Sequence, residues 1–394
     1  MTLADISSNL LLISFIAYLI ATFVFGGAVK GNKERSFKSE ERWGKIAFII
    51  TIIGFLSNLG YFFTRWGATG HVPLSNMFEF TAAFGMTLVG GFLVLYFLYK
   101  TPVLGMIVLP VALLVIAFAS MFPSEVSPLI PALQSYWLPI HVSTVVIAEG
   151  ILSISAAAGL IYLLKVVDLT KKSKRRFWLE AIMYSLILVL GFVISSTYFT
   201  LTNYEADFSY IDKDGNEAEI TYTMPPVVGM NEYESLTDGA MTPFFETPAV
   251  VNASKLTTVA WSVLIGTILY WAIRLIARKR IAALIKPFVK NVNLQLMDEI
   301  GYRAIIIGFP IFTLGALVFA MIWAQVAWSR FWGWDPKEVW ALITWLFYAA
   351  YLHLRLGKGW QGEKSAWLGV IGFAIIMFNL VAVNLIIAGL HSYA

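Results

Sequence analysis

Ten long apolar runs dominate this sequence, and each is long enough to form a helix that crosses a membrane. Such a helix needs about 20 apolar residues, and the runs are continuous, without the alternation of a transmembrane β-barrel. Charged residues make up only 13% of the chain, against roughly 25% in soluble domains. The sequence therefore predicts an all-α polytopic membrane protein and excludes a soluble enzyme and a nucleic-acid-binding module. The expected spans are 9–29, 46–63, 77–98, 103–120, 141–164, 179–200, 256–277, 302–324, 338–356 and 366–388.

Lysine and arginine are concentrated in alternate loops between these spans. The loops 30–45, 99–102, 165–178, 274–303 and 355–365 hold 23 of the 28 basic residues. Because basic loops stay on the cytoplasmic side of a membrane, we expect these loops inside and both termini outside. The first span has neither a basic residue before it nor a small-residue cleavage site, so we expect an uncleaved anchor.

The span pattern divides the chain into three segments. They are residues 1–199, with the first helices and His71 and His141; residues 200–255, an outer loop; and residues 256–394, with the last helices and His353 and His391. Residues 200–254 hold ten acidic residues and one basic residue. A hairpin-like centre at 212–215 predicts that this loop folds as a small cap. Its acidity suits either a docking face for a basic partner or a solvated surface.

Basic and apolar residues alternate in the inner stretch 274–300. This pattern is typical of an amphipathic helix lying on anionic lipid, and we expect one here. At the other end of the molecule, Glu79 lies near the start of the third span, where we expect it to cap the helix.

Three of the four histidines lie at the outer ends of expected spans, namely His71, His141 and His391. The fourth, His353, lies in the ninth span, about 26 Å along the helix from Pro336, which places it in the inner half of the bilayer. Polar residues at that depth are costly and often functional, although a histidine bonded to a neighbouring helix, or placed at the inner interface, fits as well. Glu149, eight residues after His141, is a second intramembrane group that could orient a ligand or relay protons.

Tryptophans crowd the segment AWSRFWGWDPKEVWALITW, at 328, 332, 334, 340 and 345. Asp335, Pro336 and Glu338 are a typical helix start, and anchoring at the interface explains one or two of the indoles. Three tryptophans in seven residues, beside Arg330 and on the face that carries the histidines, suit haem. Imidazole binds iron, indole packs on the porphyrin, and arginine pairs with a propionate. From these residues alone, a haem site and a tryptophan-lined transporter both remain open.

The run WGWDPKEVWALITWLFYAAYLHLR resembles the tryptophan-rich "WWD" signature of haem-handling membrane proteins. More narrowly, the chain resembles the CcsA/ResC family of system II cytochrome c synthases, and ResC of Gram-positive bacteria in particular. The segments GHVPLSNMFEF, LQSYWLPIHVS and NLIIAGLHSYA agree with that family, so the likeness covers about 40–165 and 299–394. It leaves out 179–200, 256–277 and the loop between them. Ser329 and Arg330 depart from the family pattern, which usually has a glycine followed by a variable residue.

The resemblance implies roles for individual residues. His141 and His391 would be the axial ligands of haem at the outer face, beside a platform for haem attachment. His353 would bind haem in transit, with the second ligand supplied by a partner membrane subunit. No role is implied for His71. The platform residues are Trp328, Trp332, Trp334 and Asp335.

The resemblance also implies an activity and its setting. The chain would be a subunit of a cytochrome c synthase in the bacterial plasma membrane, and would act as an enzyme within that complex. It would carry haem b outward for attachment to the CxxCH thiols of apocytochrome c. The implied partners are a ResB/CcsB-like subunit, apocytochrome c and a thioredoxin-like thiol reductant, and the chain has no cysteine to compete with those thiols. Two alternatives are a haem transporter or chaperone without attachment activity and a non-haem, tryptophan-rich transporter.

Overall fold

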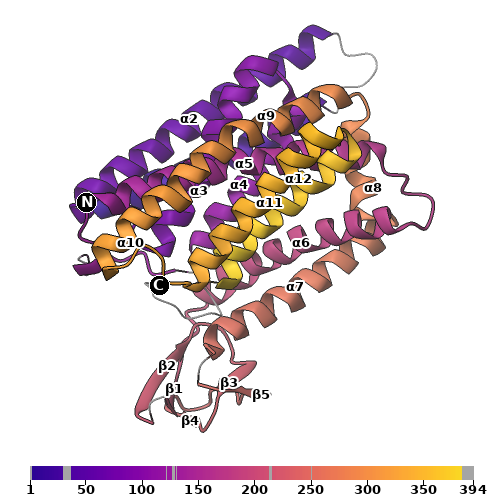
Figure 1. Ribbon diagram of the computed structural model, residues 1–394. Coiled ribbons are helices and arrows are strands. Elements are labelled where there is room, and N and C mark those ends of the chain that lie inside the picture. The colour runs from indigo at the N-terminus through magenta and orange to yellow at the C-terminus, as the bar shows by residue number, and fades with distance from the viewer. Residues whose placement is uncertain are drawn as a thin grey trace. The chain divides into compact units, whose positions relative to one another are not determined.

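The computed structural model describes residues 2–29, 37–120, 122–126, 129, 131–212, 215–249 and 251–383. Within these residues ten helices are long and apolar enough to cross a membrane, at the ten places that the sequence predicts (Figure 1). The all-α polytopic fold is therefore confirmed. The spans are α1 (Leu3–Val29), α2 (Phe37–Thr69), α3 (Met77–Tyr99), α4 (Pro102–Ala119), α5 (Trp137–Val166), α6 (Lys174–Leu201), α7 (Ala253–Ala277), the continuous run of α9 (Leu294–Phe312), the π-helix η3 (Thr313–Phe319) and α10 (Ala320–Trp328), then α11 (Pro336–Lys358), and α12 (Glu363–Phe378) with the π-helix η4 (Asn379–Val383).

The expected interfacial helix over 274–300 is wrong, because the chain breaks there several times. α7 ends at Ala277, and Arg278 adopts a left-handed conformation with φ 51°. A short helix α8 (Ile281–Ile285) and a 3₁₀ turn η2 (Lys286–Val289) follow, and Pro287 in that turn has no N–H to continue a helix. α9 then starts after Asn293, whose side chain accepts the N–H of Gln295.

The described residues form two compact units, and the first holds α1 to α5 together with Ile285–Leu380. α5 is its central helix. In its apolar stretch of 18 residues 78% are buried, against 28% in the corresponding stretches of α1 and α2. Small residues allow the other helices to approach α5 closely, as is common between helices in membranes. A Cβ on Gly159 would lie 2.6 Å from the backbone oxygen of Ala366 on α12. A 3₁₀ turn η1 (Pro131–Leu133) precedes α5.

The second unit holds Leu169–Leu284, which comprises α6, α7 and the strands between them. The antiparallel pair of β1 and β2 pairs Ala206 with Tyr222 and Ile211 with Glu217, which is the hairpin that the sequence predicts. This small β domain has its own core of Phe208, Tyr222 and Met230. Its strands are β1 (Ala206–Ile211), β2 (Glu217–Tyr222), β3 (Val228–Met230), β4 (Glu234–Ser235) and β5 (Phe245–Thr247), in a sheet of order β2-β1-β4 and a parallel pair of β3 and β5.

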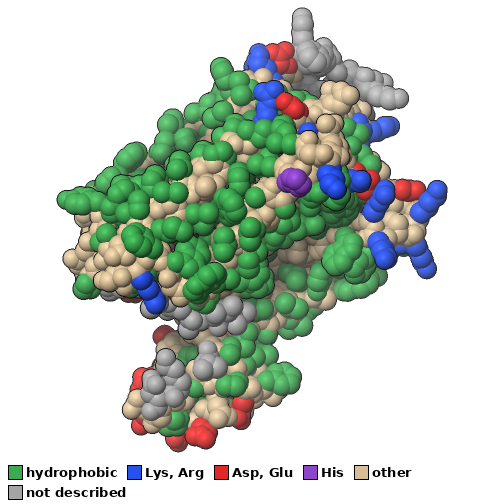
Figure 2. All heavy atoms as spheres, viewed as in Figure 1, with side chains coloured by type: hydrophobic (Ala, Val, Ile, Leu, Met, Phe, Trp, Pro, Cys, Tyr) green, Lys and Arg blue, Asp and Glu red, His purple; other side chains and the backbone are tan. Residues whose placement is uncertain are grey.

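The surface of the molecule agrees with a membrane location. Figure 2 shows hydrophobic side chains over the flanks of the helices and acidic side chains on the β domain. Large apolar residues such as Phe23, Phe97 and Leu275 are more than 70% exposed on helical flanks. In water such surfaces would be unfavourable, whereas lipid solvates them. The chain is therefore a multi-pass membrane protein.

Candidate functional site

His141 lies in the first two turns of α5, and a backbone carbonyl fixes its ring. Its Nδ1 is 2.9 Å from the oxygen of Gly315 in η3. A carbonyl oxygen only accepts hydrogen bonds, so Nδ1 carries the proton and Nε2 carries the lone pair of the neutral ring. The imidazole is half-buried, and it stacks on the indole of Trp323 with ring centroids 5.7 Å apart and planes 12° from parallel. The ring is therefore held in the tautomer whose Nε2 can bind iron.

Trp323 connects His141 to the predicted tryptophan platform. This indole is 2% exposed and packs edge-on against Trp328, with centroids 4.8 Å apart. Leu133 and Leu138 complete a small buried cluster around it. The sequence did not predict a role for Trp323, because this residue lies inside an expected span, where an aromatic side chain needs no special explanation. Its spacing of five residues from Trp328 was the only available signal.

The turn before α11 holds the other two platform tryptophans. Trp332 and Trp334 pack edge to face, with centroids 6.1 Å apart, and Trp334 is 69% exposed. Trp334 adopts a left-handed conformation with φ 57°, which an L residue keeps only when its surroundings impose it. A single carboxylate organises the turn: Oε2 of Glu338 accepts the N–H groups of Gly333 and Asp335, at 2.7 and 3.1 Å.

Asp335 and Glu338 form a capping box at the start of α11, with Pro336 in the first turn, as the sequence predicts. Both carboxylates are buried, so the position of the tryptophan turn and the start of α11 are set by the same two side chains. Arg330 is exposed, and its guanidinium lies against Gly333. A Cβ added to Gly333 would be only 2.7–2.8 Å from the guanidinium atoms. The absence of a side chain at Gly333 therefore leaves room for the Arg330 guanidinium beside the turn.

His353 is differently placed from His141. It lies five residues before the end of α11, and its side chain is exposed at the surface of this chain. Its ring makes no hydrogen bond with any described residue, so the alternative of a histidine bonded to a neighbouring helix finds no support there. The exposed residues of α11 recur at alternating intervals of three and four residues. This spacing is seen in Ile343, Leu346, Ala350, His353 and Gly357, and near the end of the helix Leu356 and Lys358 are exposed as well.

A buried ion pair fixes the helix end that carries His353. The guanidinium of Arg355 donates to both carboxylate oxygens of Asp298 on α9, each at 2.7 Å. The same carboxylate accepts the N–H of Gly362 at 3.0 Å, and Arg355 lies over the ring of Tyr302. Three segments, α9, α11 and the start of α12, therefore meet at Asp298. This clamp could not be predicted from the sequence, because Asp298 was expected on an interfacial helix.

Glu149 is buried in α5, as an intramembrane position requires. Tyr348 of α11, also fully buried, lies within electrostatic range of it. Glu149 lies farther along α5 than His141, and Tyr348 lies before His353 on α11. The role predicted for Glu149, orienting a ligand or relaying protons, stays a prediction.

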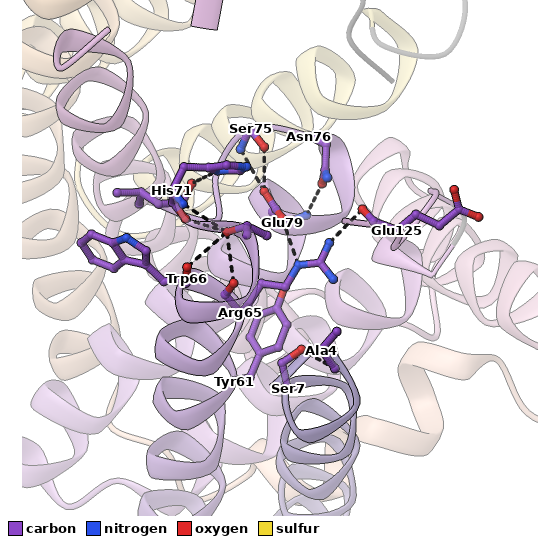
Figure 3. Close-up of polar contacts among 12 residues, drawn as sticks. Ala4, Ser7, Tyr61, Arg65, Trp66, His71, Ser75, Asn76, Glu79 and Glu125 are labelled. Atoms are coloured by element: carbon purple, nitrogen blue, oxygen red, sulfur yellow. Dashed lines mark hydrogen bonds and ion pairs between the residues drawn. The ribbon is translucent and has the colours of Figure 1, made fainter. Parts of the chain in front are cut away.

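His71 belongs to a different polar cluster, at the ends of α2 and α3 (Figure 3). Arg65, 2% exposed, donates from Nε to Glu79 at 3.0 Å and from Nη2 to the backbone of Glu125 at 3.2 Å. Asn76 is the N-cap residue of α3, and its Oδ1 accepts the Glu79 N–H. Glu79 takes part in the same helix start, because its Oε2 accepts the backbone N–H and the hydroxyl of Ser75 at 3.1 and 2.9 Å. Nδ1 of His71 donates to the carbonyl of Val72, and its buried Nε2 has no partner among the described residues.

The structure thus brings some of the predicted site residues together. His141 and Trp328 meet through Trp323, and Trp332, Trp334, Arg330 and Asp335 share one turn. His353 is separate from both groups along the helix axis. The predicted second outer ligand, His391, lies outside the described residues.

Comparison with known proteins identifies the family. Residues 254–391 match the sequence model of the cytochrome C assembly protein family. The chain is 31% identical to cytochrome c biogenesis protein CcsA of Trieres chinensis over 361 residues, which cover 90% of this chain and 88% of the relative. The chain belongs to the CcsA/ResC family of cytochrome c biogenesis proteins. The CcsA of Nostoc punctiforme is also 31% identical, over 84% of this chain and 82% of its own length.

The family match extends further than the resemblance seen in the sequence. That resemblance left out 256–277, whereas the family's model begins at residue 254 and so includes all but the first residue of α7. Apolar spans carry few distinctive residues, so the resemblance is visible only in the segments with tryptophan and histidine. CcsA/ResC membership therefore rests on most of the chain.

Proposed function

We propose that this chain is the subunit of a cytochrome c synthase that carries haem b across the bacterial plasma membrane and presents it at the outer face. There the haem becomes covalently attached to the CxxCH thiols of apocytochrome c. Membership of a cytochrome c biogenesis family supports a role in cytochrome c maturation and haem handling in general. The concentration of 23 of 28 basic residues in alternate loops supports the orientation, with the attachment site and both termini outside.

The observation that carries the proposal is the geometry of His141. Nδ1–H is bound to Gly315, so Nε2 is the nitrogen able to ligate iron, and such a bond to the other nitrogen is usual for metal-binding histidines. Stacking on Trp323, which packs on Trp328, gives the ligand a rigid aromatic support. His391 would be the second axial ligand. Trp332, Trp334 and Asp335 would complete the platform, and the exposed Arg330 would pair with a propionate.

At the other position, His353 would bind haem during transit together with a ligand from a ResB/CcsB-like subunit. The exposed stripe of α11 supports this arrangement, because residues spaced alternately by three and four form the contact face of a packed helix pair. A single histidine in an apolar stripe is also costly against lipid. A partner helix covering the stripe would remove that cost and supply the second imidazole.

The attachment chemistry places clear demands on the site. Each cysteine S–H adds across one vinyl group, so that a C–S and a C–H bond form and no net electrons are transferred. The thiols must be reduced beforehand, which calls for a thioredoxin-like thiol reductant, and the chain itself contains no cysteine that could react instead. Holding two thiols against two vinyl groups in one orientation would supply most of the rate.

Co-expression tests the proposal. The chain is produced with a CxxCH acceptor, with and without the ResB/CcsB-like subunit, and covalent haem is detected on the denatured acceptor. An acceptor with serine in place of both cysteines is the control. We expect covalent haem on the CxxCH acceptor and none on the serine control. Haem bound to the chain without transfer would favour the transporter or chaperone, and no haem on either protein would favour a non-haem transporter.

A further inference from the structure

The helix that faces His141 changes its winding at the point of contact. α9, η3 and α10 form one continuous span, and residues Thr313–Phe319 are wound as a π-helix. In an α-helix the Gly315 carbonyl would accept the N–H of residue 319; here it accepts the N–H of Ala320, five residues on. The same oxygen accepts Nδ1–H of His141 from α5. Wide turns of this kind occur preferentially at functional positions.

Close approach of the two backbones makes this contact possible. A Cβ on Gly315 would lie 2.8 Å from the backbone nitrogen of Val145 and 3.0 Å from the carbonyl carbon of Thr144. Neither atom can move aside without moving α5. Val145 follows His141 by one helical turn, so the absence of a side chain at Gly315 sets the distance between its carbonyl and the imidazole.

A contact from α11 anchors the first residue of the π-helix. Nε1–H of Trp345 donates to Oγ1 of Thr313 at 2.9 Å. The Thr313 hydroxyl in turn donates to the carbonyl of Phe309 at 2.8 Å, and the ring of Phe309 stacks on Trp345 with centroids 5.7 Å apart. The wide turn is thus held from two sides, by α5 at Gly315 and by α11 at Thr313.

We propose that the π-helix Thr313–Phe319 is a positioning element for His141, in which the Gly315 carbonyl sets the tautomer and orientation of the imidazole. A hydrogen bond from Nδ1–H to a carbonyl makes the ring a stronger electron donor at Nε2. The π-helix therefore lowers the reduction potential of iron bound there, because electron donation favours the oxidised metal. This second consequence rests on the proposed haem-binding function, whereas the tautomer does not.

The test compares Gly315→Ala with Gly301→Ala in the full-length chain. Gly301 lies on the same helix and faces the same α5, but a Cβ there would meet the Ser155 oxygen at an ordinary 3.6 Å. The first readout needs no haem. The ¹⁵N spectra of histidine-labelled protein are recorded at about pH 8, where an ordinary imidazole is neutral. The signals of His141 are identified by their loss in His141→Ala. Wild type and Gly301→Ala should show the Nδ1–H tautomer, and Gly315→Ala a mixture.

The second readout is the midpoint potential of haem in the purified membrane complex. Gly315→Ala should raise it, and a tenfold change in the oxidised-to-reduced ratio corresponds to about 59 mV. If Gly315→Ala does not accumulate in the membrane, Trp345→Phe serves, since it keeps the ring stacked on Phe309 and removes only the N–H; a smaller rise is expected. Identical tautomers and potentials in Gly301→Ala and in the Gly315→Ala or Trp345→Phe variant would overturn the proposal. A wild-type complex without haem would instead count against the proposed function and leave the tautomer result standing.

Discussion

His141 and His353 are both predicted haem ligands, yet the protein holds them in opposite ways. His141 is half-buried, bonded through Nδ1 to Gly315 and stacked on Trp323. His353 is exposed and has no hydrogen bond within the described part of the chain; only the helix end that bears it is fixed, through Arg355 and Asp298. One histidine is positioned through its own ring, and the other through its backbone alone.

This difference bears on how haem could be held firmly at one place and passed on at the other. A ring fixed by a hydrogen bond and a stacked indole is preorganised, so little freedom is lost when iron binds. A ring on an exposed stripe is free to rotate and needs a second protein surface to complete its site. We therefore expect a tight outer position and an inner position that depends on the partner subunit.

Removal of the two histidines should have the largest effects. His141→Ala should lower covalent attachment to the acceptor by more than the roughly 10–100-fold typical of changes around a metal ligand, because the proposed ligand itself is lost. Added imidazole should partly restore attachment, since the outer site lies near a helix end. Added imidazole should restore less attachment to His353→Ala, because the partner subunit covers this position. Equal rescue of both variants would show that water reaches the inner position as easily as the outer one.

Loss of the Asp298 clamp should rank second. Asp298→Asn breaks a pair whose side chains are 7% and 15% exposed, and such losses cost about 3–5 kcal/mol. Glu299→Gln is the matched control, because Glu299 pairs with Arg303 at the surface, with side chains 43% and 56% exposed, where an ion pair contributes little to stability. Thermal unfolding in detergent measures both variants, and Asp298→Asn should melt at a lower temperature than Glu299→Gln. Similar melting temperatures of the two variants would mean that the Asp298 clamp does not fix the end of α11.

The tryptophans should separate into two classes. Trp323→Ala removes a buried indole that supports His141, and buried Trp→Ala changes cost about 3–5 kcal/mol, so both stability and the haem spectrum should change. Trp334→Ala removes a ring that is 69% exposed. It should weaken haem retention and leave the spectrum unshifted, because the proposed role of this indole is to pack on the porphyrin and not to ligate iron. A shifted spectrum in Trp334→Ala would contradict that assignment.

The smallest effect concerns the β domain, which we expect to take no part in haem binding. Burial raises the pKa of Tyr222 from 10.0 to about 12, so the folded domain holds this proton over a range where the unfolded chain loses it. Its contribution to stability is complete below about pH 10 and is lost as the pH rises toward 12, by up to about 2–3 kcal/mol. Alkaline unfolding of the domain in wild type and in Tyr222→Phe measures this, and the phenylalanine variant should lack the dependence. A parallel change in the haem spectrum would tie the domain to the site.

Much of the fold could be predicted from the sequence, because lipid imposes long apolar helices and the caps are local. The ten spans, the hairpin at 206–222 and the capping box of Asp335 all follow from spacing and composition. The contacts that build the site could not be predicted. The carbonyl of Gly315 reaches His141 across 174 positions of sequence, through a π-helix that has no sequence signature.

Positions with ordinary residue types were the ones most easily misjudged. Glu79 contributes to the start of α3, as expected, but it is also one half of a buried ion pair with Arg65 that the sequence did not indicate. Residues 274–300 have the composition of an interfacial helix, but Arg278 and Pro287 interrupt it. In the first case a tertiary contact was added to the local pattern, and in the second a backbone conformation and a proline outweighed it.

The haem content of the purified complex tests the central claim most directly. The chain is isolated with its partner subunit, and the absorption spectrum and haem per complex are measured for wild type, His141→Ala, His353→Ala and the double variant. Two positions held by different histidines predict a Soret band in wild type, a reduced haem content in each single variant, and almost none in the double variant. A wild-type complex without a Soret band, or full haem content in the double variant, would contradict the account.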